Sequence, residues 1–119
     1  MKVTNKDRIN VMDMLATMLK ASTIPFERLI NIDYRYNDLY EERFPDGRMF
    51  QNQIKFVDEN KGRFLSAICH IGSYGYDDAT IEVYFGYGTP AAYLTIEQAF
   101  NLIRDYWKNV GGFADEIQD

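Results

Sequence analysis

The sequence predicts an α+β domain, a four-stranded antiparallel sheet flanked by an N-terminal and a C-terminal helix in the order α-β-β-β-β-α. Apolar residues recur at helical spacing near both ends of the chain, and apolar and polar residues alternate between them. The connections are too short for the crossovers of a parallel sheet. A length of 119 residues, 46% of them hydrophobic and 26% charged, is typical of one domain spanning 1–119.

The first helix is predicted from Ile9 to Leu19, behind Thr4 or Asn5 as candidate N-caps. Pro25 prevents the helix from continuing much further. Its apolar residues recur at intervals of three and four, as the core-facing side of a helix requires. They are Ile9, Met12, Leu15, Ala16 and Leu19.

The second helix is predicted to begin after Thr95, which with Gln98 forms a potential capping box. It should end near Val110, because Gly111 and Gly112 can adopt the left-handed conformation that closes a helix. Its apolar face consists of Ile96, Ala99, Phe100, Ile103, Tyr106, Trp107 and Val110.

The first two strands are predicted from alternation with a period of two. The first strand places apolar and aromatic residues on one face, namely Ile30, Ile32, Tyr34 and Tyr36. The second strand runs from about Met49 to Val57, after the turn signal Pro45-Asp46-Gly47. Its alternating apolar residues are Phe50, Ile54 and Phe56. The segment from Asn37 to Phe44 fits a helical turn as well as a strand extension, so both interpretations stay open.

The last two strands are predicted from Phe64 to Ile71 and from Ala79 to Phe85. The stretch from Gly86 to Pro90 breaks the pattern before the second helix. If each element turns its apolar side inward, the core contains Ile30, Ile32, Phe56, Ile68, Ile81, Val83, Phe100 and Ile103.

The residues that could carry catalysis do not form a recognisable set. Cys69 and His70 are the only cysteine and the only histidine, but neighbours on a strand point to opposite faces. Asp77, Asp78 and Glu82 offer oxygen ligands without the register of a calcium loop. The short glycine patterns lack the following helix or the Lys-Ser/Thr pair of a phosphate site. We therefore expect no enzymatic activity, no metal and no cofactor; an enzyme would have to use His70 with a nearby carboxylate.

The charge distribution is the most informative feature of the sequence. The formal net charge is −5, and no Lys or Arg occurs between Phe64 and Ile103. Four carboxylates and five tyrosines lie in that stretch, and such residues suit a protein interface with a basic partner. The predicted partner-binding residues are Tyr74, Tyr76, Asp77, Asp78, Glu82, Tyr84, Tyr87, Tyr93 and Glu97. The same residues could also simply edge and solubilise the sheet.

In size, acidity and tyrosine content the chain is similar in broad outline to the inhibitors that phages and mobile elements use against defence enzymes, including anti-CRISPR proteins that occupy a DNA-binding cleft. This resemblance implies a non-enzymatic partner for a basic protein surface, including one that otherwise holds nucleic acid. An acidic chain argues against direct nucleic-acid binding. A small-molecule binding module or a subunit of a homo-oligomer are the alternatives.

The charged N-terminal residues and the lack of a long apolar window predict a soluble, cytoplasmic protein without a membrane span. A single cysteine fits a reducing compartment.

Overall fold

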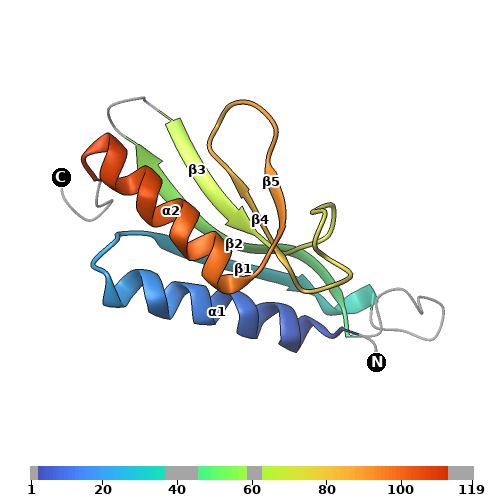
Figure 1. Ribbon diagram of the computed structural model, residues 1–119. Coiled ribbons are helices and arrows are strands. Elements are labelled where there is room, and N and C mark those ends of the chain that lie inside the picture. The colour runs from blue at the N-terminus through green and yellow to red at the C-terminus, as the bar shows by residue number, and fades with distance from the viewer. Residues whose placement is uncertain (1–2, 37–45, 59–62, 113–119) are drawn as a thin grey trace.

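Both helices cover the same face of an antiparallel sheet in the computed structural model (Figure 1), which describes residues 3–36, 46–58 and 63–112. The elements in chain order are α1 (Asn5–Ala21), β1 (Glu27–Asp33), the 3-10 helix η1 (Tyr34–Tyr36), β2 (Arg48–Asp58), β3 (Arg63–Ile68), β4 (Ile81–Tyr84), β5 (Ala91–Leu94) and α2 (Ile96–Val110). The predicted α+β class with a helix at each end is confirmed. The segment from Asn37 to Phe44, left open between helix and strand, lies outside the described residues.

Local capping interactions define the ends of both helices. At α1, the hydroxyl of Thr4 accepts from the amide of Asp7, whose carboxylate accepts from the amide of Thr4. Thr95 and Gln98 form the same capping box at α2, as predicted, and Gly111 closes that helix with a φ of 80°. These contacts satisfy backbone groups that a helix end leaves without partners.

The sheet has five strands instead of the predicted four, in the order β1-β2-β3-β4-β5 with every neighbouring pair antiparallel. The additional strand is β5, which was predicted only as the connection between the fourth strand and the second helix. It has four residues, none of them β-branched, and it follows a cluster of turn-forming residues. Its pairing with β4 therefore left no recognisable pattern in the sequence.

A β-bulge in β2 changes which residues of that strand face the helices. Asn31 pairs with Gln51 and Ile32 pairs with Met49, so Phe50 is an extra residue on β2. Met49 is consequently fully buried, whereas Phe50 is 45% exposed. The prediction that Phe50 shares a buried face with Ile54 was wrong because one inserted residue reverses the alternation.

The predicted core is correct for five of its eight residues: Phe56, Ile81, Val83, Phe100 and Ile103 are buried in the main cluster. Ile30 is 47% exposed on β1, an edge strand. Ile32 is only half-buried, where the bulge shifts the register. Ile68 lies opposite Gln53 and Glu82 on the face away from the helices, because β3 turns Leu65 and Ala67 inward. The first strand also ends earlier than predicted, since Tyr34–Tyr36 form η1.

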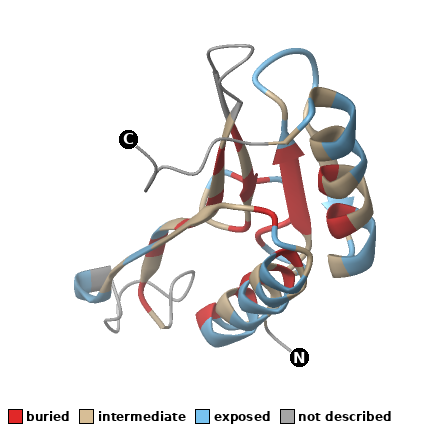
Figure 2. Ribbon diagram, turned by 90° about the vertical axis from the view of Figure 1, so that its left-hand side faces the viewer, coloured by how far each residue is buried: buried red, intermediate tan, exposed pale blue. Residues whose placement is uncertain are grey.

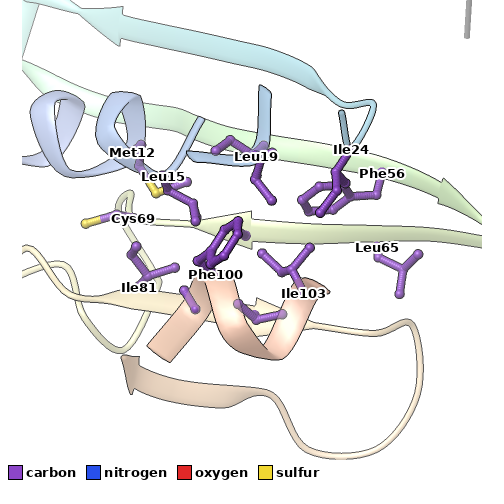
Figure 3. Close-up of a cluster of buried hydrophobic side chains, with 14 residues drawn as sticks. Met12, Leu15, Leu19, Ile24, Phe56, Leu65, Cys69, Ile81, Phe100 and Ile103 are labelled. Atoms are coloured by element: carbon purple, nitrogen blue, oxygen red, sulfur yellow. The ribbon is translucent and has the colours of Figure 1, made fainter. Parts of the chain in front are cut away.

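The core lies between the helices and one face of the sheet. Figure 2 shows the buried positions on the strands and on the sides of the helices that meet them. Figure 3 shows the side chains of the two helices meeting over the strands, with Phe100 near the middle of the cluster. Met12, Leu15 and Leu19 are the fully buried contribution of α1. Within the described ranges neither α1 nor α2 covers the opposite face of the sheet.

Candidate functional site

The nine predicted partner-binding residues fall in the β3–β4 loop (69–80), on β4 and β5, in the turn between those strands and at the start of α2. Seven of them are exposed and two are buried. The exposed tyrosine side chains have relative exposures of 63% for Tyr74, 37% for Tyr84 and 57% for both Tyr87 and Tyr93. Most of the predicted residues are therefore accessible to a partner.

Tyr76 and Glu82 are the two that are buried, at 9% and 8% exposure. The ring of Tyr76 lies beneath the guanidinium of Arg8, whose Cζ is 3.6 Å from the ring centroid. Glu82 Oε1 accepts a hydrogen bond of 3.2 Å from the backbone amide of Tyr74. Tyr76 thus packs inside the protein instead of presenting its ring, and Glu82 is shielded from the solvent in which it was expected.

Two of the exposed tyrosines, from different elements of the chain, have neighbouring rings. The rings of Tyr74 in the loop and Tyr93 on β5 have centroids 6.2 Å apart and are tilted by 46°. Tyr93 has a φ of +58°, an unusual left-handed conformation for a bulky residue. Ile81 pairs with Leu94 and Val83 with Ala91, so two residues of β5, Ala92 and Tyr93, stand opposite Glu82 alone. This bulge brings Tyr93 next to the carboxylate-bearing position of β4.

Three exposed carboxylates accompany the tyrosines. Asp77 and Asp78 belong to the loop, and Glu97 belongs to the first turn of α2. Over the described ranges the ion pairs join Arg28 to Asp13, Arg35 to Asp33 and Arg104 to Asp105, and none involves these three carboxylates. Their charges are therefore not neutralised by a contact within the described part of the chain.

A network of buried polar side chains holds the loop in place. Arg8 is 5% exposed; its Nε donates to the carbonyl of Tyr76 at 2.7 Å and its Nη1 donates to Asn5 Oδ1 at 2.7 Å. Asn52 is fully buried and donates to the carbonyls of Arg8 at 3.0 Å and Cys69 at 2.9 Å. At Gly75 the loop approaches Thr80 so closely that a Cβ would collide with it. The position of the loop is thus set by residues of α1 and β2.

The sequence interpretation missed this network, although the sequence carried a signal for it. Arg8 is separated from Met12 and Leu15 by four and seven positions, so it lies on the buried side of α1. Asn52 alternates in phase with Ile54 and Phe56 and so faces the core. A polar residue at a core-facing position needs hydrogen-bond partners, and the spacing of the apolar residues is enough to indicate that need.

Cys69 and His70 have separate environments. Burial raises the pKa of the Cys69 thiol to about 11, so it is protonated at neutral pH. Nδ1 of His70 lies 2.8 Å from the carbonyl of Ile71, the geometry of a ring N–H donor to that oxygen. Among the described residues, no three His, Cys, Asp or Glu side chains lie close enough together to hold a metal ion.

Comparisons with protein-family models, with curated proteins and with solved structures find no match for the chain. Neither of the two described helices has the length and apolar character needed to cross a lipid bilayer.

Proposed function

We propose that this protein is a non-enzymatic binding domain whose tyrosines and carboxylates engage a basic protein surface. The partner would be a nucleic-acid-binding enzyme, and the protein would act as an inhibitor of the anti-CRISPR kind. The observation that carries the proposal is the exposed pair Tyr74 and Tyr93, whose rings are neighbours, with the exposed carboxylates Asp77, Asp78 and Glu97 a few residues away in a stretch of the sequence without Lys or Arg. We call these five residues the acidic tyrosine surface.

The two residue types would contribute to binding in different ways. Unneutralised carboxylates attract a positively charged surface over about 10 Å at 0.1 M salt, which raises the association rate. Exposed tyrosines bring large, rigid contact areas that exclude water, and their loss speeds dissociation. Carboxylates presented in this way also compete for arginine and lysine side chains that would otherwise hold phosphates.

The test neutralises the surface without altering its shape. The variant carries Asp77→Asn, Asp78→Asn and Glu97→Gln. Both the wild type and the variant are used to capture proteins from a bacterial lysate, and each captured protein is purified for kinetic measurements across a salt series. We expect the wild type to retain a basic, nucleic-acid-binding protein, nucleic acid to compete with it, and the variant to associate more slowly.

A matched control variant separates the effect of these three carboxylates from the effect of the protein's net charge. Asn10→Lys, Thr17→Lys and Asn109→Lys change the net charge by the same three units at exposed helix positions. This control should associate with the purified partner faster than the neutralised variant does. The proposal is overturned if both triple variants slow association equally, or if no basic protein distinguishes the wild type from the neutralised variant.

A further inference from the structure

We infer that Tyr74, Tyr93 and Glu82 together form a seat for a single arginine side chain of the partner. This inference rests on the proposed function and identifies the kind of side chain that the same surface recognises. The three residues are contiguous: the Tyr74 amide donates to Glu82, the rings of Tyr74 and Tyr93 are in contact, and the β5 bulge places Tyr93 opposite Glu82.

Glu82 is the first reason to expect a cation at this position. The residue is only 8% exposed and lies on the face of the sheet away from the helices, opposite Ile68. Within the described residues, its one hydrogen bond comes from the amide of Tyr74, and it has no ion pair. A carboxylate with so little exposure and a single neutral N–H partner is well placed to take a cation, because that N–H offsets only part of its lost hydration.

The tyrosine pair is the second reason. A cation is attracted to an aromatic ring when it lies within about 6 Å of the centroid. Because the two centroids are 6.2 Å apart, one guanidinium at the mouth of the tilted pair can lie within that range of both rings. The rings are too close for a guanidinium to be sandwiched between them, so it would stack on an outward face. The protein already uses this contact internally, where Arg8 lies over Tyr76.

Arginine fits this arrangement better than lysine. Its planar guanidinium can stack on a ring while its edge donates to a carboxylate, whereas an ammonium is a compact, strongly hydrated charge. The backbone of Tyr93 adds a separate point, since its positive φ at the bulge sets the direction in which the side chain leaves β5. The ring contact between Tyr74 and Tyr93 further limits the side-chain freedom that binding would have to remove.

The direct test uses three short peptides that differ at one position. Each has two glycines on either side of arginine, lysine or citrulline, and citrulline keeps the shape of arginine but carries no charge. The peptides are titrated into the labelled full chain at low salt and followed by NMR. Arginine should give saturable shifts at the Tyr74 and Tyr93 rings and at the Glu82 side chain, lysine weaker ones and citrulline none. Equal shifts with arginine and citrulline, or shifts confined to other residues, would overturn the inference.

Substitutions separate the charged hydrogen bond to Glu82 from the stacking of the guanidinium on the tyrosine rings. Glu82→Gln should weaken arginine binding about tenfold, because a hydrogen bond to a charged group is replaced by one to a neutral amide. Tyr74→Phe should bind as the wild type does, whereas Tyr74→Leu should bind much more weakly. Tyr74 is exposed, so its replacement keeps the test valid if Glu82→Gln does not fold. Tyr34→Leu, at an equally exposed tyrosine on η1, should have no effect. An unchanged affinity in Tyr74→Leu would contradict the seat.

The outcomes distinguish this inference from the proposed function. Suppose that the arginine peptide binds at Tyr74, Tyr93 and Glu82, but that no basic protein distinguishes the wild type from the neutralised variant. The proposed function is then refuted and the inference about arginine is supported. If neutralisation slows association with a purified partner while the arginine peptide gives no shifts at Tyr74, Tyr93 and Glu82, the inference about arginine fails and the proposed function stands.

Discussion

Asn52→Ala should destabilise the protein by about 3–5 kcal/mol, although Asn52 is a polar residue. Its side chain is fully buried and makes three hydrogen bonds. Nδ2 donates to the carbonyls of Arg8 and Cys69, and Oδ1 accepts from Nη2 of Arg28 at 2.6 Å. The substitution thus removes contacts that join β2 to α1, to the end of β3 and to the edge strand β1.

The magnitude follows from the groups left behind. Each neutral hydrogen bond contributes about 1 kcal/mol and one from a charged donor about 1.5–3 kcal/mol. Arg28 keeps its contacts with Asp13 and with two backbone carbonyls, so the main penalty falls on the buried carbonyl of Cys69 and on the cavity. A loss of this size is a large share of the roughly 5–15 kcal/mol that stabilises a typical domain.

Urea unfolding followed by circular dichroism measures the effect. Gln53→Ala is the matched control, because Gln53 is the next residue on β2, faces away from the helices and contacts Gln51. We expect the control to lose less than about 1 kcal/mol. If Asn52→Ala loses equally little, the buried network does not hold the loop as described.

Three further predictions follow from burial and charge. Phe100→Ala should cost about 3–5 kcal/mol of unfolding free energy and Ile68→Ala distinctly less, and equal losses in urea unfolding would contradict their placement. The Cys69 thiol should react slowly with a thiol reagent at pH 8 until the protein is denatured; rapid labelling of the native protein would show that it is exposed. The side-chain hydrogen bond from Arg35 lowers the pKa of Asp33 to about 2, so the stabilisation it gives is present above pH 3.8 and is lost as the pH falls towards 2. In an NMR titration Arg35→Gln should return the pKa of Asp33 towards 3.8. An unchanged pKa would show that the hydrogen bond from Arg35 does not cause the shift.

The ends of α2 and the order of the first four strands could be predicted because the signals for them are local. Thr95 and Gln98 are three residues apart, and their reciprocal hydrogen bonds form within one turn. Helix spacing likewise identified Met12, Leu15 and Leu19 as buried without any knowledge of what they contact. Short antiparallel connections then left few topologies for the sheet.

Strand faces were less predictable, because a bulge depends on the partner strand. The inserted residue Phe50 has the alternation of a regular strand in the sequence, but pairing with β1 places Met49 in the core instead. The same holds for β5, where the bulge at Ala92 and Tyr93 appears only through pairing with β4. Hydrophobic pattern alone cannot reveal either shift, since both residues at a bulge are compatible with a strand.

Glu82 shows why a charged residue in the sequence need not be exposed on the surface of the folded protein. Glu82 alternates with the buried Ile81 and Val83, and it faces away from the helices as that pattern implies. The exposure expected of it is lost because Tyr74 in the loop donates to its carboxylate, and the position of the loop depends on Arg8 from the other end of the chain. Long-range contacts of this kind leave no trace in local charge patterns.

The consequence is a division of roles between the carboxylates of the acidic tyrosine surface and Glu82. Exposed carboxylates act at a distance and are weakened by salt, so Asp77 and Asp78 would bring a basic partner close without selecting any one of its side chains. A carboxylate shielded from water interacts more strongly but over a short range, and it requires a cation in one position. Glu82, which lies next to Tyr74 and Tyr93, would therefore select one arginine side chain of the partner. The exposed carboxylates would attract any basic surface.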